Sequence, residues 1–212
     1  RLLVIRSAIG CEYQEPLVVP QAPDPGISID PTLSLELGDS VTLHALLPVG
    51  YPVALIDTIL WTPVDGLTFT GNSIFEMLSP GVKPFKSTEY TVTLVSKDGC
   101  EAEDRILIRV DNEPHVYIPN AFSPWAEDGE NDVFLIYADG KQIVQVNKFQ
   151  VYDRWGEQLF VNKNFLPDDP QVGWPGDFKG EPVNPGVFVW WAEVELVDGQ
   201  KILMKGDVTV VR

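Results

Sequence analysis

Short hydrophobic runs that alternate with polar residues, each ended by glycine or proline, constrain this chain more than any other feature. Eighteen Pro and seventeen Gly are spread through 212 residues, between runs rich in Val, Ile, Leu, Thr, Tyr and Trp. Proline removes a backbone donor and glycine opens turns, so both residues end regular elements. Alternation over about four to eight residues is typical of half-buried strands. The sequence therefore predicts an all-β chain of many short strands.

The charge balance argues against nucleic acid as a partner. The chain carries 15 Lys and Arg against 31 Asp and Glu, a formal net charge of −16, whereas neutralising phosphates needs clustered cations. A hydrophobic fraction of 44% is enough for compact cores, so we interpret the acidity as the solubility of an exposed protein. No hydrophobic run approaches the ~20 residues of a membrane-spanning helix, and we expect a protein that does not itself span a membrane.

A self-similarity at an offset of 89 residues (100 − 11) indicates tandem domains. Around both Cys11 and Cys100, a hydrophobic strand is followed by Ser, by Gly-Cys-Glu and by a second hydrophobic strand. Residues 1–22 are therefore expected to be the last hairpin of an upstream Ig-like domain plus a linker, in a protein that extends further upstream. Because the two cysteines occupy equivalent places in successive domains, we predict unpaired, buried thiols.

A Pro-rich stretch at residues 21–26 marks the linker after which a second domain begins. Alternation on both sides of Gly38-Asp39 predicts an antiparallel hairpin over residues 33–45. Further strands are predicted at residues 59–61, around Phe69, at Ile74-Phe75 and at residues 90–95, which makes residues 23–112 an Ig-like β-sandwich of six or seven strands. Trp61 is expected in its core rather than as a sugar-stacking platform.

Residues 113–212 contain two further hairpin signals and a valine-rich end. Residues 153–156 turn between a strand that ends at Tyr152 and one at 158–161, and Asp198-Gly199 joins residues 187–197 to 201–211. Period-two alternation places the hydrophobic set Phe188, Trp190, Ala192, Val194 and Leu196 on the core face of the second hairpin. Residues 208–211 alternate poorly, so the final strand is expected either to be buried on both sides or to offer an edge to a partner.

Seven motifs carry a family resemblance across this last segment. They are residues 117–124 (YIPNAFSP), 128–134 (DGENDVF), 151–157 (VYDRWGE), 173–176 (GWPG), 185–190 (PGVFVW), 197–200 (VDGQ) and 205–212 (KGDVTVVR). The segment resembles the gliding-motility-associated C-terminal domain of Bacteroidetes (CHU_C-like), which is the type B sorting signal of the type IX secretion system. The domain before it resembles the PKD/Ig-like repeats of long adhesins.

Together, pattern and resemblance predict tandem Ig-like antiparallel β-sandwiches, the last being the C-terminal sorting domain. The resemblance implies a non-enzymatic chain that is exported and then stays attached to the outer membrane or becomes extracellular. The implied partners are the type IX translocon, a PorV-like shuttle and a PorP/SprF-like outer-membrane barrel. The residues expected to meet them are Tyr152, Asp153, Arg154, Trp155 and Gly156 at the turn, and Lys205, Gly206, Asp207, Val208, Thr209, Val210, Val211 and Arg212 at the end.

Calcium is the one cofactor that the sequence suggests. Glu127, Asp128, Asn131 and Asp132 place four oxygen donors around a Gly turn, as a hard cation needs. Compared with the usual loop of the family, this segment is one residue longer and lacks the early Asn. The same residues are also typical of a solvated turn with Asx caps, which is the alternative interpretation.

Two other functions compete with the sorting signal. Five of the six Trp lie in the final domain, and Trp125, Trp155 or Trp174 would serve as the platform of a carbohydrate-binding module of a secreted polysaccharide-degrading enzyme. A hydrolase finds little support, because His44 and His115 stand apart from any Ser/His/Asp set and no paired carboxylates have a recognisable context.

Overall fold

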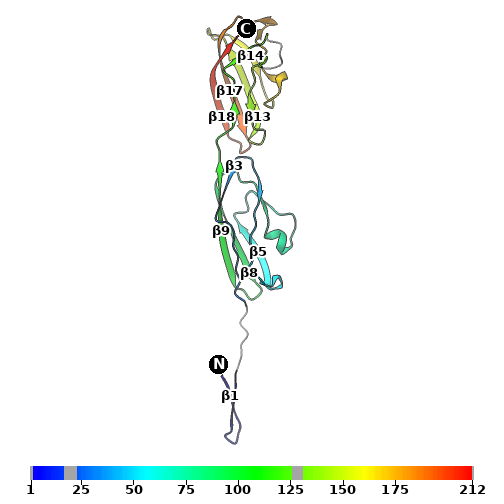
Figure 1. Ribbon diagram of the computed structural model, residues 1–212, viewed down its shortest axis with the longest axis vertical. Helices are drawn as coiled ribbons and strands as arrows, with labels where there is room; N and C mark the ends of the chain where they lie inside the picture. The colour runs from blue at the N-terminus through cyan, green and yellow to red at the C-terminus, as the bar shows by residue number, and fades with distance from the viewer. Residues whose placement is uncertain (1, 17–22, 126–130, 212) are drawn as a thin grey trace.

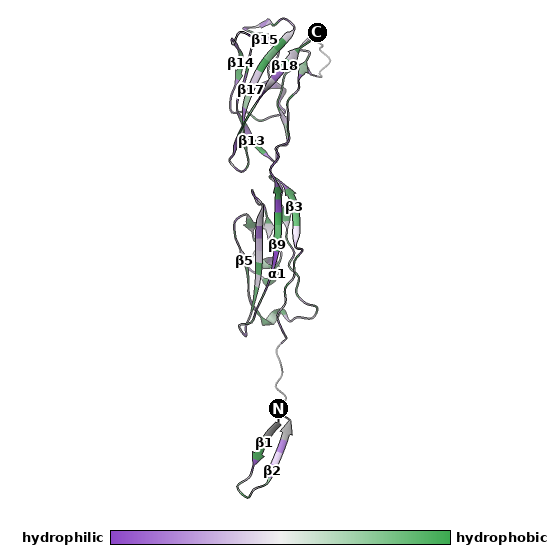
Figure 2. Cartoon of the chain, turned by 90° about the vertical axis from the view of Figure 1, so that its left-hand side faces the viewer, coloured by the Kyte–Doolittle hydropathy of each residue, from purple (hydrophilic) through white to green (hydrophobic). Residues whose placement is uncertain are grey.

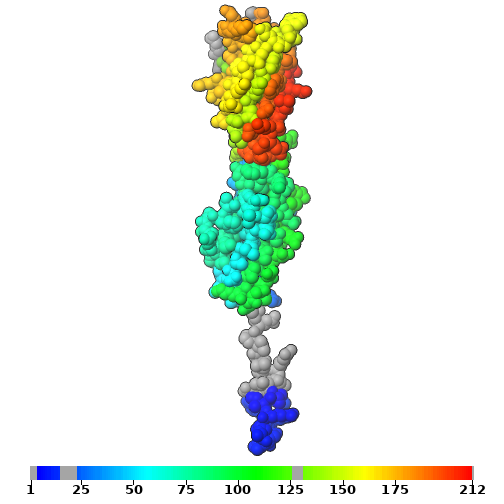
Figure 3. All heavy atoms as spheres, turned by 180° about the vertical axis from the view of Figure 1, so that it is seen from behind, coloured from blue at the N-terminus to red at the C-terminus, as the bar shows by residue number. Residues whose placement is uncertain are grey.

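The computed structural model describes residues 2–16, 23–125 and 131–211 as an elongated, nearly all-β chain (Figure 1). Beyond the N-terminal hairpin, a middle unit and a C-terminal unit follow each other along the long axis (Figure 3). Each has its own hydrophobic core. The predicted fold class, all-β with Ig-like sandwiches, is confirmed. Among the described residues, no helix has the length and hydrophobicity that crossing a membrane requires.

The N-terminal hairpin consists of β1 (Leu2–Arg6) and β2 (Glu12–Pro16), and its turn repeats the turn at Ser96–Cys100. In both, the serine N–H donates to the cysteine carbonyl, at 2.9 Å from Ser7 and 2.8 Å from Ser96. The serine Oγ accepts from the cysteine N–H in each turn. The glycines have φ of 86° and 80°, which explains why glycine precedes cysteine in both. The sequence repeat is thus a repeat of turn geometry.

Both cysteines are free, as predicted, but the prediction that they are buried is wrong. Cys11 and Cys100 each follow the glycine of a hairpin turn and are exposed. A residue at a hairpin turn lies beyond the end of the paired strands, where the opposite sheet cannot cover it. Position in the turn therefore outweighs the usual preference of cysteine for the interior.

The middle unit packs a four-stranded sheet against a three-stranded one. The first has the order β3-β9-β8-β5, with β3 (Thr32–Glu36), β9 (Glu101–Asp111), β8 (Thr88–Ser96) and β5 (Ile56–Thr62). The second has the order β4-β7-β6, with β4 (Val41–Thr42), β7 (Gly81–Val82) and β6 (Leu67–Thr68), and a 3-10 turn (Val53–Leu55) precedes β5. β3 pairs with β9 in parallel, and the other pairs are antiparallel.

Alternating residues of the middle strands face one core. Figure 2 shows hydrophobic and hydrophilic residues along both β5 and β9. Trp61 is 4% exposed, as the sequence predicts for a core residue, and its Nε1–H donates to the Met77 carbonyl at 2.7 Å. Tyr90, Val92 and Leu94 of β8 are each at most 1% exposed. This alternation buries one face of β8. Because a shift by one residue would expose the buried side chains, it fixes the register of β8 against β5 and β9.

The predicted antiparallel hairpin over residues 33–45 is wrong. β3 and β4 belong to different sheets, because the chain turns at Gly38, where φ is +90°, and crosses from one layer to the other. Both segments alternate as the sequence indicates. Their partners are β9 and β7, which lie far away in sequence, and the periodicity of a strand carries no information about such a partner.

The prediction of a strand at Ile74-Phe75 is also wrong, since α1 (Ile74–Met77) begins there, whereas Phe69 directly follows β6. The Ser73 Oγ accepts from the Glu76 N–H, and the Glu76 carboxylate accepts from the Ser73 N–H at 3.0 Å, which forms a capping box. The hydrogen bond from the Ser73 hydroxyl, and to a smaller extent the one from the Ser73 N–H, holds the pKa of the Glu76 carboxyl below its usual value. Local capping outweighs the β-propensity of Ile74 and Phe75.

The C-terminal unit is built on a five-stranded sheet of order β11-β18-β17-β13-β14. Its strands are β11 (Ala121–Phe122), β18 (Lys201–Val210), β17 (Gly186–Leu196), β13 (Ile143–Tyr152) and β14 (Gln158–Asn162). The smaller elements are the pair β10 (Val116–Tyr117) and β12 (Tyr137–Ala138), the pair β15 (Asp177–Phe178) and β16 (Glu181–Pro182), and a 3-10 turn (Pro170–Val172). Both predicted hairpins, β13–β14 and β17–β18, are confirmed.

The core face of β17 is the face predicted from the sequence. Each of its residues is at most 8% exposed: Phe188, Trp190, Ala192, Val194 and Leu196. Opposite them, Phe134 and Trp174 are both 0% exposed and exchange two backbone hydrogen bonds of 2.9 and 3.0 Å. Because Trp174 packs edge-on against Phe188 and Phe134 packs edge-on against Trp190, aromatic contacts hold these loops to the sheet.

A joint connects the two units through the turn after β3. Leu37 is 1% exposed and belongs to the core of the C-terminal unit, although it follows a strand of the middle unit. Lys141 Nζ lies 3.0 Å from Asp39 Oδ1, and this hydrogen bond raises the pKa of Lys141. His115 Nδ1 lies 3.8 Å from Glu36 Oε2. The C-terminal core is therefore completed by a residue of the preceding unit.

We expect Gly38→Ala to loosen this joint. Gly38 has φ of +90°, and a Cβ there would meet the Lys141 carbonyl, so the change should cost about 1–3 kcal/mol. Gly140→Ala is the control, because nothing lies within 4 Å of a Cβ at Gly140. Urea unfolding and amide hydrogen exchange at residues 36–39 and 139–142 measure the effect. Equal protection in the two variants would show that the joint tolerates a side chain.

Candidate functional site

The sheet brings together the two segments that the sequence selects for partner recognition. Tyr152 ends β13, residues 205–210 lie in β18, and β17 lies between these strands and pairs with both (Figure 1). Tyr152, Val189 and Asp207 form one row across the three strands. Since neighbouring strands are about 4.8 Å apart, the two segments lie roughly 10 Å from each other. Tyr152 and the exposed residues of β18 therefore share one face of one sheet.

The residues of the terminal strand divide between the core and the surface. Val208 and Val210 are 0% and 1% exposed, and the backbone of Gly206 lies against the Trp190 ring. Lys205 and Asp207 point to the opposite, exposed face. Thr209 is half-buried, Val211 is 40% exposed, and Arg212 lies outside the described residues. Only part of the predicted recognition segment is thus accessible to a partner.

Neither sequence interpretation of residues 208–211 is right for the whole segment. Val208 and Val210 are buried on one face, whereas Thr209 and Val211 lie on the other, so the strand is not buried on both sides. Its end is not a free edge either, because the N–H groups of Thr209 and Val211 donate to Asn120 and Phe122 of the β11 segment at 2.9 and 3.0 Å. Within the described part of the chain, residues 201–207 of β18 pair with β17 alone.

The outer face of the sheet carries an apolar patch, which we call the outer-face patch. It is a shallow hollow of about 700 Å³ and is lined chiefly by Tyr152, Val189, Trp191, Leu203 and Lys205. Val189 is 48% and Leu203 is 67% exposed. Exposed apolar groups gathered in one place on a sheet face are typical of interaction surfaces. The patch contains residues from both predicted recognition segments.

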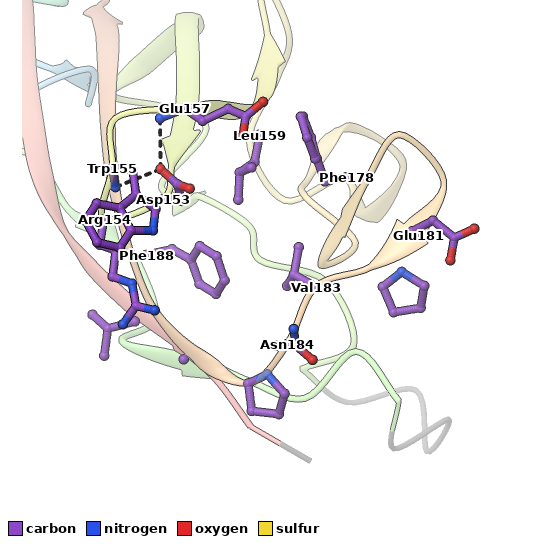
Figure 4. Close-up of a pocket in the computed structure, with 14 residues that line it drawn as sticks. Asp153, Arg154, Trp155, Glu157, Leu159, Phe178, Glu181, Val183, Asn184 and Phe188 are labelled. Carbon is purple, nitrogen blue, oxygen red and sulfur yellow. Dashed lines mark hydrogen bonds between the residues drawn. The ribbon is translucent and has the colours of Figure 1, made fainter.

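A second hollow, the turn groove, lies beside this patch (Figure 4). It has a volume of about 420 Å³ and runs between residues 153–157 and residues 181–188. Asp153 shapes the turn, since its Oδ1 accepts from the N–H groups of Trp155 and Glu157, both at 2.8 Å. Gly156 has φ of +87°, as the turn requires. The predicted turn residues therefore form one wall of a groove.

The turn groove has an apolar floor and a polar rim. Figure 4 shows that Leu159, Phe178, Val183 and Phe188 face its interior. Glu157, Glu181 and Asn184 lie at the rim, with Asp153 and Arg154. The Arg154 guanidinium lies 5.3 Å from the centre of the Trp155 ring, and Trp155 is 82% exposed. Such a groove can hold an apolar group and a cation side by side.

Several residues of both surfaces were not selected from the sequence as recognition residues. Phe178 and Glu181 of the groove come from the hairpin β15–β16, and Val189, Trp191 and Leu203 lie on the outer face of β17 and β18. The alternation along β17 already assigned Val189 and Trp191 to the face opposite the core. No periodic pattern marked the short β15–β16 hairpin, because each of its strands has only two residues.

The three candidate platform tryptophans have different environments. Trp174 is 0% exposed and its Nε1–H donates to the Asp177 carbonyl at 2.9 Å, so it cannot stack against a sugar. Trp125 is half-buried against the core. Trp155 projects from its turn. A carbohydrate platform in this unit would depend chiefly on Trp155.

The predicted calcium residues are only partly described. Glu127 and Asp128 lie outside the described residues. Asn131 has φ of +56°, and its carbonyl accepts from the Ser123 N–H at 2.9 Å, while Asp132 is half-buried beside it. Asn adopts a positive φ in turns more readily than most residues do. Calcium binding by these four residues stays a prediction.

The histidines make isolated surface contacts. His44 Nδ1 lies 3.2 Å from Ser79 Oγ, and His115 faces Glu36 across the joint. In the part of the chain that the structure describes, no group of three or more His, Cys, Asp or Glu is placed to hold a metal ion. His44 thus makes a surface hydrogen bond, whereas the His115 ring lies only within ion-pair distance of a carboxylate.

Comparison with protein families gives one match, in the C-terminal unit. Residues 116–210 match the model of the CHU_C type IX secretion signal domain. This range covers β10 to β18 and contains both the outer-face patch and the turn groove. Comparison with curated proteins gives no match.

Similar solved structures include fibronectin(III)-like modules of Clostridium thermocellum CbhA, with a TM-score of 0.29 and 13% identity over 87% of this chain and 93% of that one. The glucan utilisation protein SGBP-B of Bacteroides ovatus, in complex with a mixed-linkage heptasaccharide, has a TM-score of 0.28 and 14% identity over 98% and 51%. A Ca²⁺-stabilized adhesin of an ice-binding Antarctic bacterium has a TM-score of 0.30 and 12% identity over 99% and 55%. The chain spans about half the length of the last two proteins.

Proposed function

We propose that residues 116–210, which match the CHU_C type IX secretion signal domain, carry an upstream surface protein through the outer membrane and hold it at the cell surface. The Ig-like middle unit acts as a stalk between the cargo and the attachment point. The cargo is a large adhesin or gliding-type protein, since tandem β modules with repeated turns are typical of such stalks. The chain itself performs no catalysis.

The observation that carries this proposal is the family match to a folded unit that presents residues of both recognition segments on one exposed face. The turn at residues 153–156 and the exposed residues of β18 lie on either side of β17. A secretion apparatus that acts after folding can bind such a face. Buried motif residues such as Trp174 instead stabilise the fold of the unit. The proposed partners are the type IX translocon, a PorV-like shuttle and a PorP/SprF-like outer-membrane barrel.

A reporter fusion tests this function. A periplasmic reporter joined to residues 1–212 is expected to reach the cell surface of a Bacteroidetes strain with a working type IX system. The whole chain is used because Leu37 completes the C-terminal core. The reporter alone, and the fusion in a strain without the translocon, are the controls. Protease accessibility on intact cells distinguishes attachment from release into the medium, and a fusion that stays in the periplasm would refute the proposal.

The alternative, a carbohydrate-binding module of a polysaccharide-degrading enzyme, is supported by the exposure of Trp155. Its weak point is the burial of Trp174, which removes one of the three candidate platforms. A glycan array probed with the purified chain distinguishes the two functions. Strong binding to one polysaccharide class, lost in Trp155→Ala, would favour this alternative.

A further inference from the structure

The turn groove and the outer-face patch are lined by neighbouring residues of the chain. Val187 lines the groove and Val189 lines the patch, and both project from the same face of β17. On the neighbouring strand, Tyr152 lines the patch and the next residue, Asp153, lines the groove. A ligand in the groove would therefore extend over the outer-face patch, which lies between the two recognition segments.

The charges of the turn groove are mostly negative. Asp153, Glu157 and Glu181 line it, against the guanidinium of Arg154 and the ammonium of Lys179, which lies 4.4 Å from the centre of the Phe178 ring. Arg154 is directed at the Trp155 ring, at 5.3 Å from its centre. The whole chain has a net charge of −16, so its long-range field adds to this local excess. An anionic ligand would be repelled from the groove, and a cationic one would be attracted.

The floor of the groove requires an apolar group in its occupant. Leu159, Val183 and Phe188 offer no side-chain hydrogen-bond partner, so sugar hydroxyls placed there would lose their hydrogen bonds to water. One face of Trp155 is also shared with Arg154, which competes with a stacked sugar ring. The combination of an apolar floor with carboxylates at the rim matches an aliphatic or aromatic side chain next to a lysine or arginine.

We propose that the turn groove binds a peptide segment of the secretion apparatus in which an apolar side chain lies beside a lysine or arginine. The apolar side chain enters between Leu159 and Phe188, and the cation meets Glu157 and Glu181 at the rim. This inference rests on the proposed function, because it names the kind of partner that reads the sorting domain. Exposed charges contribute mainly to specificity and association rate, which suits a transient encounter during export.

Binding is tested with defined peptides on the full chain. Acetyl-Leu-Arg-Leu-amide is expected to shift the NMR signals of the Trp155 indole and of amides 153–157 and 183–187. Acetyl-Leu-Glu-Leu-amide, which reverses the charge, and acetyl-Ser-Arg-Ser-amide, which removes the apolar groups, should bind at least about fivefold more weakly. Equal shifts from all three peptides, no shifts from any, or stronger shifts from cellohexaose would each overturn the proposal.

Matched variants test whether the peptide binds in the turn groove. Glu157→Gln with Glu181→Gln should weaken binding of the arginine peptide about fivefold, because two exposed ion pairs are lost. Asp98→Gln with Glu101→Gln removes the same charge from a hairpin of the middle unit and should leave the dissociation constant unchanged. Equal weakening in both pairs would show that net charge, and not the groove, attracts the peptide.

The reporter fusion then separates this inference from the proposed function. Glu157→Lys with Glu181→Lys should reduce surface display at least about fivefold, while Asp98→Lys with Glu101→Lys should not. If the unaltered fusion is exported and both charge-reversed pairs are exported equally well, the groove inference fails and the secretion function stands. If the unaltered fusion stays in the periplasm, the secretion function fails, and with it the assignment of the peptide to the secretion apparatus.

Discussion

Deleting residues 205–212 is expected to unfold the C-terminal unit and, for that reason, to abolish export. The deletion removes Val208 and Val210, which are 0% and 1% exposed, at ~1.5–3 kcal/mol each. It also uncovers the ring of Trp190 and breaks the pairing with β17 and β11. Against a typical total stability of about 5–15 kcal/mol, this loss is decisive. Loss of the cooperative unfolding transition and of near-UV circular dichroism measures it.

Because unfolding alone would abolish export, the deletion does not test whether the terminal residues contact a partner. Substitutions at exposed residues of β18 are therefore the control. Lys205→Ser and Asp207→Ser change only the outer face and should alter the free energy of unfolding by less than about 0.5 kcal/mol. Any effect of these two changes on export would then report recognition rather than folding. A truncated chain that still unfolds cooperatively with native circular dichroism would contradict the expected role of β18.

The sequence was sufficient to predict strands and turns where the local residue pattern agrees with the burial of each strand. Along β17 the alternation predicted the core face correctly, because one side of the strand packs against Phe134 and Trp174 and the other meets solvent. The turns at Gly156 and Gly199 were predictable for the same kind of reason, since each has a positive φ that glycine adopts without strain. The two hairpins follow from these local rules.

Sequence reasoning failed where pairing is long-range or where two local signals compete. Nothing in residues 33–45 shows that β3 pairs with β9 some seventy residues away, in parallel, instead of with the next strand. At Ser73 and Glu76, the capping box competes with a run of strand-forming residues and prevails. The valine-rich end was misread because its covering strand, β11, has only two residues and lies about ninety residues earlier.

The candidate site was predicted in parts that the fold then assembled. Motif resemblance selected Tyr152 and Lys205, but the row that joins them through β17 follows from strand order, which no local pattern encodes. The negative rim of the turn groove depends on Glu181, which lies on a separate short hairpin. A recognition surface assembled from β13, β17, β18, the turn at residues 153–157 and the hairpin β15–β16 therefore becomes visible only after tertiary packing is known.

Replacing Trp174 with alanine should cost ~3–5 kcal/mol, whereas replacing Trp155 should cost less than about 0.5 kcal/mol. Trp174 is 0% exposed, contacts Phe122 and Phe188, and donates from Nε1 to the Asp177 carbonyl at 2.9 Å. Trp155 is 82% exposed, so alanine leaves no cavity there. Urea denaturation of both variants measures the difference.

The two tryptophan variants also distinguish a structural motif from a recognition motif within the same family signature. Trp174→Ala should impair export together with stability, and lowering the temperature should restore part of both, because the folded fraction rises. Trp155→Ala should leave the unfolding midpoint unchanged and impair export at every temperature, because a contact surface is lost while the fold persists. If Trp155→Ala lowered stability as much as Trp174→Ala, its turn would be part of the core, and the turn groove would lose its role as a binding surface.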